Sequence, residues 1–340
     1  MAQRVTVLDV AKAAGVHPST VSRALKPETR SLLTDKVSAR ILEVASALGY
    51  RPNGIAASLR TRRSQTVGVV IPDITNPVFP PNLRGLEEVL DAEGYIAMVA
   101  NAGGDAERQR LVVDRLLARQ VDGLVMATVA RRDPVVDFCI AAGTPLVMVN
   151  RAEAARRVSS VVSDDALGMG LAIDHLAALG HRRIGLIAGP QHLSTGLGRR
   201  QGFTAAMERN GLAEDPAAVV FAAAFARDAG REAAGRLLDA APDITAVMAA
   251  NDLLALGVYD VAAERGLRCP EDLSVIGHND MPMVDMVSPA LTTVHIRHRE
   301  MGMQAGRLLL SLMRSTSQGG VDVVLQPTLI VRASTATARA

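Results

Sequence analysis

A short run near the amino terminus, Thr6 to Leu25, constrains this chain more than any other segment. It has the pattern of two brief helices on either side of Gly15. Thr6 and Asp9 have the spacing of a capping box at the start of the first helix. Gly15 can end that helix in a left-handed conformation that other residues resist. Pro18 then fits the first turn of the second helix, where its missing N–H costs no hydrogen bond. The run predicts a helix-turn-helix.

The second helix of this motif has an apolar inner face and a small, polar outer face. The outward residues are Ser19, Thr20, Ser22 and Arg23. A third helix is expected to begin after Thr34 and to end at Gly49. Its apolar stripe consists of Val37, Ile41, Val44, Ala45 and Leu48. A compact helical unit with such an outer face is typical of proteins that place one helix in the major groove of DNA.

Charge divides the chain at about the same place. Residues 1–63 contain eleven Lys and Arg against four Asp and Glu, a net of +7. The remaining residues contain 26 basic against 31 acidic side chains, a net of −5, and the whole chain carries +2. A basic head on an acidic body indicates a polyanionic partner. Together with the helix-turn-helix pattern, this asymmetry predicts double-stranded DNA as that partner.

Length and composition narrow the remaining possibilities. At 340 residues the chain can form two or three domains, each with its own core. No apolar run approaches the roughly eighteen residues of a membrane span, and the first residues lack the apolar core of a signal peptide. Cys139 and Cys269 are the only cysteines, and their spacing is not that of metal ligands. We therefore expect a cytoplasmic protein with no membrane segment, no metal and no cofactor.

From Gln65 onward, short aliphatic strands alternate with helices. The strand patterns lie at 67–71, 96–100, 123–126 and 145–149, and again at 183–188, 246–249 and 274–277. Helical stretches such as 83–93 and 107–119 lie between them. Continuous apolar strands separated by helices predict parallel, doubly wound α/β sheets, and the restart of the pattern predicts two lobes. Ligands of such sheets bind beyond the carboxyl ends of the strands.

These motifs resemble those of the lactose/galactose repressor (LacI/GalR) family over nearly the whole chain. The head carries the resemblance through A-G-V at 14–16, S-T-V-S-R-A-L at 19–25 and L-G-Y-R-P-N at 48–53. The body adds D-I-T-N-P at 73–77 and A-N-D-L-L-A-L-G at 250–257. The resemblance implies a sequence-specific transcriptional regulator, a repressor rather than an enzyme. It would bind a near-palindromic operator as a homodimer under the control of a small sugar or sugar-acid effector.

The resemblance also implies which head residues contact DNA. The expected base contacts are Pro18, Ser19 and Arg23, and the expected phosphate contacts are Thr20, Ser22, Tyr50 and Asn53. Thr6 and Ala56 belong to the same contact set. Leu59 matches the family's hinge-helix leucine, which wedges into the minor groove at the operator centre. His17 replaces the capping serine of many members, so the start of the second helix is open at this point.

Domain limits follow from the same resemblance. We expect a head at 1–50, a hinge helix and linker at 51–63, and an effector-binding and dimerisation core at 64–340. Because the family's core shares the periplasmic sugar-binding fold, the chain should cross between two lobes near Ser163, Leu291 and Val323. The N-lobe would then comprise about 64–163 and 292–323, and the C-lobe about 164–291 and 324–340.

The expected effector site lies in the cleft between the lobes. Its predicted residues are Asp73, Asn76, Phe79, Asn150, Thr195, Arg199, Phe225, Asn251 and Asn279. Asn279 stands where the family usually has an aspartate. An amide both donates and accepts hydrogen bonds, so it tolerates a carboxylate that an aspartate would repel. Together with Arg199, this departure favours an acidic or oxidised sugar derivative.

Other functions are weighed against this interpretation. A purine- or other metabolite-responsive regulator of the same family stays open, although the loop at 191–195 lacks the arginine expected for a purine carbonyl. A sugar-binding transport protein would share the body but lack the basic head and require a secretory signal. An enzyme is disfavoured, because the sequence has no phosphate-binding Walker loop. His295 and His298 likewise lack the carboxylate pattern that would complete a metal site.

Overall fold

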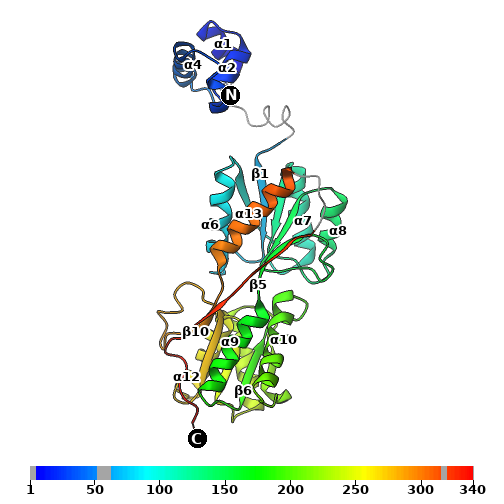
Figure 1. Ribbon diagram of the computed structural model, residues 1–340, viewed down its shortest axis with the longest axis vertical. Helices are drawn as coiled ribbons and strands as arrows, with labels where there is room; N and C mark the ends of the chain where they lie inside the picture. Colours follow the sequence, from blue (N-terminus) through cyan, green and yellow to red (C-terminus); the bar gives the residue numbers. More distant parts are fainter. Residues whose placement is uncertain (1–4, 52–62, 315–319, 340) are drawn as a thin grey trace. The chain divides into compact units, whose positions relative to one another are not determined.

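The computed structural model describes residues 5–51, 63–314 and 320–339. The chain forms two compact units, one up to Ser64 and one from Gln65 onward. Figure 1 shows a small all-helical unit and a larger unit in which helices surround two sheets. No helix of the described residues is long and apolar enough to cross a lipid bilayer.

The small unit is the predicted helix-turn-helix with one additional turn of helix. Its helices are α1 (Val7–Ala14), α2 (Pro18–Ala24), α3 (Pro27–Arg30) and α4 (Asp35–Ala47). The capping box of Thr6 and Asp9 is confirmed, and Gly15 ends α1 with a φ of 64°. The short α3 was not expected from the sequence. Buried side chains from α1, α2 and α4 form one core, made of Val10, Ala11, Ala14, Val21, Ala24, Ile41 and Ala45.

The large unit contains two six-stranded sheets, which define an N-lobe and a C-lobe. The N-lobe sheet has the order β11-β5-β4-β3-β1-β2 and the C-lobe sheet the order β12-β10-β9-β8-β6-β7. All neighbouring strands are parallel except β10 and β12. The predicted α/β class with parallel sheets is therefore confirmed.

The elements of each lobe come from separate parts of the chain. The N-lobe strands are β1 (Thr66–Ile71), β2 (Ile96–Asn101), β3 (Gly123–Met126), β4 (Leu146–Val149), β5 (Ser159–Ser163) and β11 (Asp322–Leu325). Its helices are α6 (Phe79–Asp91), α7 (Ala106–Ala118), α8 (Pro134–Ala141) and α13 (His298–Arg314). The C-lobe strands are β6 (Ile184–Ala188), β7 (Val219–Phe221), β8 (Ala246–Ala249), β9 (Ser274–Asn279), β10 (Thr292–His295) and β12 (Thr328–Ile330). Its helices are α9 (Asp165–Ala178), α10 (Ser194–Arg209), η1 (Pro216–Ala218), α11 (Arg227–Ala240) and α12 (Asp252–Glu264).

Strand pairing places two of the three lobe crossings later than the sequence suggested. The first crossing follows Ser163, the last residue of β5. The second lies after His295 rather than near Leu291, because β10 pairs with β9 inside the C-lobe sheet. The third lies after Leu325 rather than near Val323, because β11 pairs with β5 along its whole length. Apolar patterns predict a strand but not which sheet receives it, and this explains both differences.

Candidate nucleic-acid interface and ligand cleft

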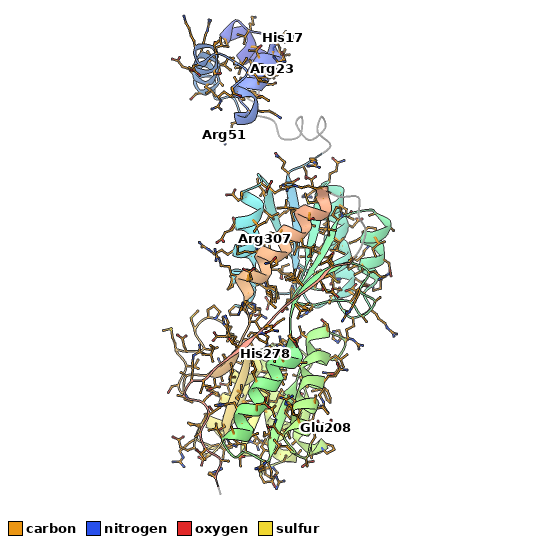
Figure 2. All side chains as sticks on the ribbon, viewed as in Figure 1. His17, Arg23, Arg51, Glu208, His278 and Arg307 are labelled. Carbon is orange, nitrogen blue, oxygen red and sulfur yellow. The ribbon has the colours of Figure 1, made fainter. Side chains whose placement is uncertain are left out.

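The outer face of α2 presents the side chains that the sequence assigned to DNA. Val21 and Ala24 are fully buried against α1 and α4, whereas Ser19 and Arg23 are exposed. Among the described residues, the Arg23 guanidinium has no hydrogen-bond or ion-pair partner. Figure 2 shows Arg23 and His17 on the helical unit. The second helix thus offers a polar and cationic outer surface.

His17 itself caps this helix. Its ring Nδ1 accepts a hydrogen bond from the Ser19 backbone N–H at 3.3 Å and lies 2.8 Å from the Ser19 hydroxyl. The histidine ring therefore does what a serine side chain does at the N-cap of other helices. This contact settles where α2 begins, the point that the sequence left open. It also holds the Ser19 side chain close to the helix start.

The carboxyl end of α2 is fixed by two side chains from the next turn. Thr29 donates its hydroxyl to the carbonyl of Arg23 at 3.0 Å, and Arg30 donates Nε to the carbonyl of Ala24 at 2.9 Å. These bonds satisfy carbonyls that a helix end leaves without partners. The backbone that carries Arg23 is therefore held at both ends of the helix.

The other predicted DNA contacts have different positions. Asn53, Ala56 and Leu59 lie outside the described residues. Tyr50 is half-buried and packs against the head core, with its backbone N–H bonded to the carbonyl of Ala45 at 2.9 Å. Both the amide and the hydroxyl of Thr6 donate to the Asp9 carboxylate. Thr6 therefore has a structural role in the cap, whatever it contacts besides.

A cleft in the large unit gathers most of the predicted effector residues. It is lined by Pro72, Asn76, Val78, Phe79, Asn150, Arg151, Thr195, Arg199, Phe225, Asn251 and Asn279. These residues follow or end strands β1, β4, β7, β8 and β9, or lie at the amino-terminal parts of α6 and α10. The carboxyl ends of both parallel sheets thus face the cleft, as the rule for ligand sites in such sheets requires. Eight of the nine predicted residues lie there.

Asp73 is the exception. It is exposed and does not line the cleft. Its carboxylate accepts hydrogen bonds from the backbone N–H of Thr75 at 2.9 Å and from the Thr75 hydroxyl at 2.7 Å. This is the local turn that aspartate commonly forms with the residue two positions later. The structure thus gives Asp73 a backbone role in place of the expected position in the cleft.

Arg199 is the most constrained side chain of the cleft. Its Nε donates to Asp165 at 2.8 Å, its Nη1 donates to the carbonyl of Ala250 at 2.5 Å, and its Nη2 donates to Oδ1 of Asn279 at 3.2 Å. The side chains of Arg199 and Asp165 are 4% and 14% exposed. Burial raises the pKa of the Asp165 carboxyl, while the neighbouring guanidinium of Arg199 opposes that rise. Helices α9 and α10 and the ends of strands β8 and β9 are thereby tied together under the cleft.

Aromatic and apolar side chains complete the walls. The Phe225 ring lies 5.8 Å from the guanidinium carbon of Arg199, within the range of a cation–π contact. The ring packs over Gly189, where a Cβ atom would lie 2.3 Å from it. Phe79 is buried at the start of α6 on the N-lobe side. A planar apolar face beside polar groups suits a sugar ring, which presents C–H groups on one face and hydroxyls at its edge.

Two asparagines shape the cleft through their backbones. Asn150 has a φ of 66° and Asn279 a φ of 117°, both in the left-handed region. Asparagine is one of the few residues with a side chain that enters this region readily. At Asn150 the turn follows β4 directly and leads into Arg151. Figure 2 places His278, the neighbour of Asn279 in β9, at the end of the C-lobe that faces the N-lobe.

Three lining residues were not predicted from the sequence, namely Pro72, Val78 and Arg151. Of these three, Arg151 is the residue with a charged side chain. Among the described residues its buried Nε has no hydrogen-bond partner, and burial together with the nearby Arg199 lowers its pKa to about 10. The hydroxyl of Thr195 is also buried without a partner. The position of Arg151, directly after a strand and beside a predicted contact, was a signal that could have identified it.

Two regions of the chain match known families. Residues 6–53 match the model described as bacterial regulatory proteins, lacI family, and residues 173–335 match that of a periplasmic binding protein-like domain. The chain is 33% identical over 336 residues to the HTH-type transcriptional regulator DegA of Bacillus subtilis, covering 98% of each chain.

Solved structures agree with these matches. The structure of a transcriptional regulator CelR–cellobiose complex has a TM-score of 0.75 at 31% identity, over 97% of this chain and all of the other. The Lac repressor dimer bound to operator and the anti-inducer ONPF has a TM-score of 0.86 at 25% identity. It covers 98% of this chain and 100% of its own.

Proposed function

Since the chain belongs to the lacI family of bacterial regulatory proteins and is a DNA-binding transcriptional regulator, we propose that a sugar or sugar acid bound in the cleft controls its operator affinity. The observation that carries this proposal is the cleft itself. Eight residues selected from the sequence for effector binding come together there from distant parts of the chain. Several of them present polar groups beside the rings of Phe79 and Phe225.

The size of the cleft favours a small ligand. The cavity among its lining residues has a volume of about 40 Å³, well below the roughly 300–1,000 Å³ of typical ligand pockets. This lobe arrangement therefore favours a ligand with a single sugar ring over a larger one. The known cellobiose complex of a related regulator supports a carbohydrate as the ligand class.

Contacts beside the cleft indicate how a ligand would act. The backbone N–H of Arg131 donates to the carbonyl of His192 at 3.0 Å, and that of Ala152 donates to the Ser194 hydroxyl at 3.0 Å. Both bonds join the N-lobe to the C-lobe next to lining residues. A ligand that binds this lobe arrangement more tightly than another shifts the population between them. Coupling of this kind typically changes the affinity of the second site by about 5- to 150-fold.

The DNA contacts of the head remain proposals. We assign direct base contacts to Arg23, Ser19 and Pro18, and phosphate contacts to Thr20, Ser22 and Tyr50. The assignments of Asn53, Ala56 and Leu59 rest on sequence alone. The sign of regulation is repression, a proposal supported by likeness to the Lac repressor on its operator. A protein that acts on operator DNA works beside the chromosome, so we place it in the cytoplasm. We assign it no enzymatic activity.

Exposed apolar side chains support a homodimer. Among the described strands, the edge strand β2 pairs with β1 alone and leaves Ile96 71% exposed, with Met98 and Val99 also exposed. On the C-lobe, Met283 and Met286 are 67% and 79% exposed. A long apolar edge strand invites pairing with another chain, and a twofold dimer covers the same patch on both copies. Such a dimer requires a near-palindromic operator.

One experiment tests this proposal in two steps. The full chain first selects its target from a random pool of duplex DNA, and the expected product is a near-palindromic sequence. A thermal-shift screen of sugars, sugar acids and nucleobases then identifies a ligand, whose effect on operator binding is measured by fluorescence anisotropy. Selection of no common sequence would contradict the DNA proposal. Stabilisation by nucleobases but by no carbohydrate would contradict the ligand class.

A further inference from the structure

The cleft contains more positive charge than its own walls balance. Of its eleven lining residues, only Arg151 and Arg199 are charged, and no aspartate or glutamate is among them. Asp165 lies behind the lining and forms an ion pair with Arg199. The lining residues together with Asp165 therefore carry one carboxylate for two guanidinium groups, a net positive charge among these described residues.

The two arginines differ in how much of their bonding capacity is used. Arg199 donates from Nε, Nη1 and Nη2 to three separate partners and is a fixed part of the wall. Within the part of the chain that the structure describes, Arg151 has one hydrogen bond, a long one of 3.4 Å from Nη1 to the carbonyl of Thr128. Its Nε is buried without a partner, and among the described residues it forms no ion pair. The unbalanced charge therefore belongs to Arg151.

A second unused group lies on the opposite lobe. Thr195, which is 3% exposed, lines the cleft, and its buried Oγ1 has no hydrogen-bond partner in the described ranges of the chain. The residues adjacent to Arg151 and Thr195 join the two lobes, because Ala152 donates its backbone N–H to the Ser194 hydroxyl at 3.0 Å. Arg151 and Thr195 are thereby held beside the same contact between the lobes.

A buried polar or charged group lowers the stability of the fold unless a partner supplies the hydrogen bonds and charge that it lost with water. A guanidinium removed from water without a counter-ion loses solvation that hydrogen bonds and charge must replace. The lowered pKa of Arg151, about 10, still leaves the side chain protonated at neutral pH. Its donors are arranged as a planar fork that fits a carboxylate or a phosphate. The neutral amide of Asn279 adds no repulsion toward such a group.

We propose that the effector is an anion whose carboxylate or phosphate group pairs with the guanidinium of Arg151 and accepts a hydrogen bond from the hydroxyl of Thr195. This inference rests on the proposed function and narrows its ligand class from sugars in general to sugar acids or sugar phosphates. It makes Arg151 the residue that selects for charge, while Arg199 and Phe225 form the wall around the ring.

Inorganic phosphate tests the anion site whatever ring the effector carries. The full chain is titrated with phosphate at fixed ionic strength, and its melting temperature is compared with that of Arg151→Met and Asn279→Asp. Arg84→Met is the matched control, because the Arg84 side chain is 75% exposed and pairs with Glu88 one turn further along α6. Any phosphate bound by the DNA-binding head affects wild type and the three variants alike. Differences in their melting temperatures therefore report phosphate binding in the cleft.

The expected result is a phosphate-dependent rise in melting temperature for wild type and Arg84→Met that is reduced in Arg151→Met. Asn279→Asp should reduce it too, because its carboxylate neutralises the cleft. An equal rise in wild type and Arg151→Met, or no rise in either, would overturn the proposal.

Sugars of matched ring structure then identify the source of the charge. Glucuronate and galacturonate, glucose 6-phosphate and galactose 6-phosphate, and the neutral hexoses are compared by calorimetry. The anionic member of a pair should bind roughly tenfold tighter or more, and Arg151→Met should remove that advantage. Tighter binding of the uronates would identify a sugar acid as the ligand, and tighter binding of the hexose 6-phosphates would identify a sugar phosphate.

Failure of this inference is separable from failure of the proposed function. If a neutral hexose binds, changes operator affinity and does so equally in Arg151→Met, the charge selection is wrong and the regulator with a sugar ligand stands. If phosphate raises the melting temperature through Arg151 but no carbohydrate changes operator affinity, the anion site stands and the proposed function fails.

Discussion

Arg199 and Asp165 form an ion pair beneath the cleft, with 2.8 Å between Nε and Oδ1 and both side chains largely removed from solvent. The pair joins α10 to the first turn of α9. The remaining donors of Arg199 reach the carbonyl of Ala250 and the amide of Asn279. A single side chain therefore links the ends of strands β8 and β9 to two helices. The same side chain lines the ligand cleft.

Removing this arginine should affect stability as well as ligand binding. Arg199→Ala leaves a buried carboxylate without its partner, and we expect a loss of about 3–5 kcal/mol in the free energy of unfolding. Arg209→Ala is the control, since its pair with Asp174 is about half-exposed and should be worth about 1 kcal/mol or less. Urea denaturation of both variants measures the difference. Equal losses would show that the Arg199 pair is not the buried link described above.

The histidine cap of α2 makes a second prediction. His17→Ala should destabilise the head by about 1 kcal/mol, because the Ser19 amide loses its acceptor. His17→Ser should retain most of that stability, since serine accepts from the same amide. Hydrogen exchange of the Ser19 amide in the full chain measures the effect. Unchanged protection in the alanine variant would rule out the cap.

Arg23 should determine base preference more than overall affinity. We expect Arg23→Met to cost about 1–3 kcal/mol on the preferred operator and to reduce discrimination among altered half-sites. A residue that contacts only phosphate would weaken binding to all sequences by a similar amount. Anisotropy titrations on the selected operator and on single-base variants distinguish these outcomes. Arg84→Met, on α6, should bind DNA as wild type does. A uniform loss on all sequences would reassign Arg23 to the phosphates.

Buried His298 predicts a change of stability with pH. Burial is the main cause that lowers the pKa of its ring to about 4, while Nε2 lies 3.1 Å from the carbonyl of Asn279. Because the unfolded chain binds this proton first as pH falls, the contribution of His298 is complete above pH about 6.5 and is lost toward pH 4. Asp252, whose pKa burial raises to about 6, acts in the opposite sense over the same range.

The comparison of His298→Gln with wild type isolates one of these groups. The stability of the variant relative to wild type should rise by about 3 kcal/mol as the pH falls from 6.5 to 4. Denaturant unfolding at a series of pH values measures this difference, and Asp252 contributes equally to both proteins. A difference that stays constant across the range would show that the His298 ring is not kept neutral by burial.

Several features of the fold were predictable because they depend on local chemistry. The capping box at Thr6, the left-handed Gly15 and the proline in the first turn of α2 each act within a few residues. The alternation of apolar strands and helices predicted the parallel sheets for a similar reason. The choice of sheet for Thr292–His295 was not local. It depends on pairing with β9, which no apolar pattern specifies.

The cleft residues also divide into those that local sequence could predict and those that depend on long-range contacts. Asn150, Asn251 and Asn279 could be selected because strand ends are where ligands bind in parallel sheets. Asp73 lies outside the cleft lining, and its carboxylate accepts a hydrogen bond from the backbone of Thr75 two positions later. Arg151 was not selected from the sequence as a ligand contact, because its charge balance depends on which acids fold close to it. Only the three-dimensional structure shows that Arg199 has Asp165 while Nε of Arg151 has no such partner.

The measurement that tests the central claim most directly is operator binding by the full chain with and without a cleft ligand. Fluorescence anisotropy on the selected operator should show a change in affinity of about 5- to 150-fold when the ligand saturates the cleft. Arg199→Gln should bind the operator in the absence of ligand and lose that change. A ligand that binds Arg199→Gln more weakly than wild type occupies the cleft. If such a ligand leaves the operator affinity of wild type unaltered, control through the cleft is contradicted.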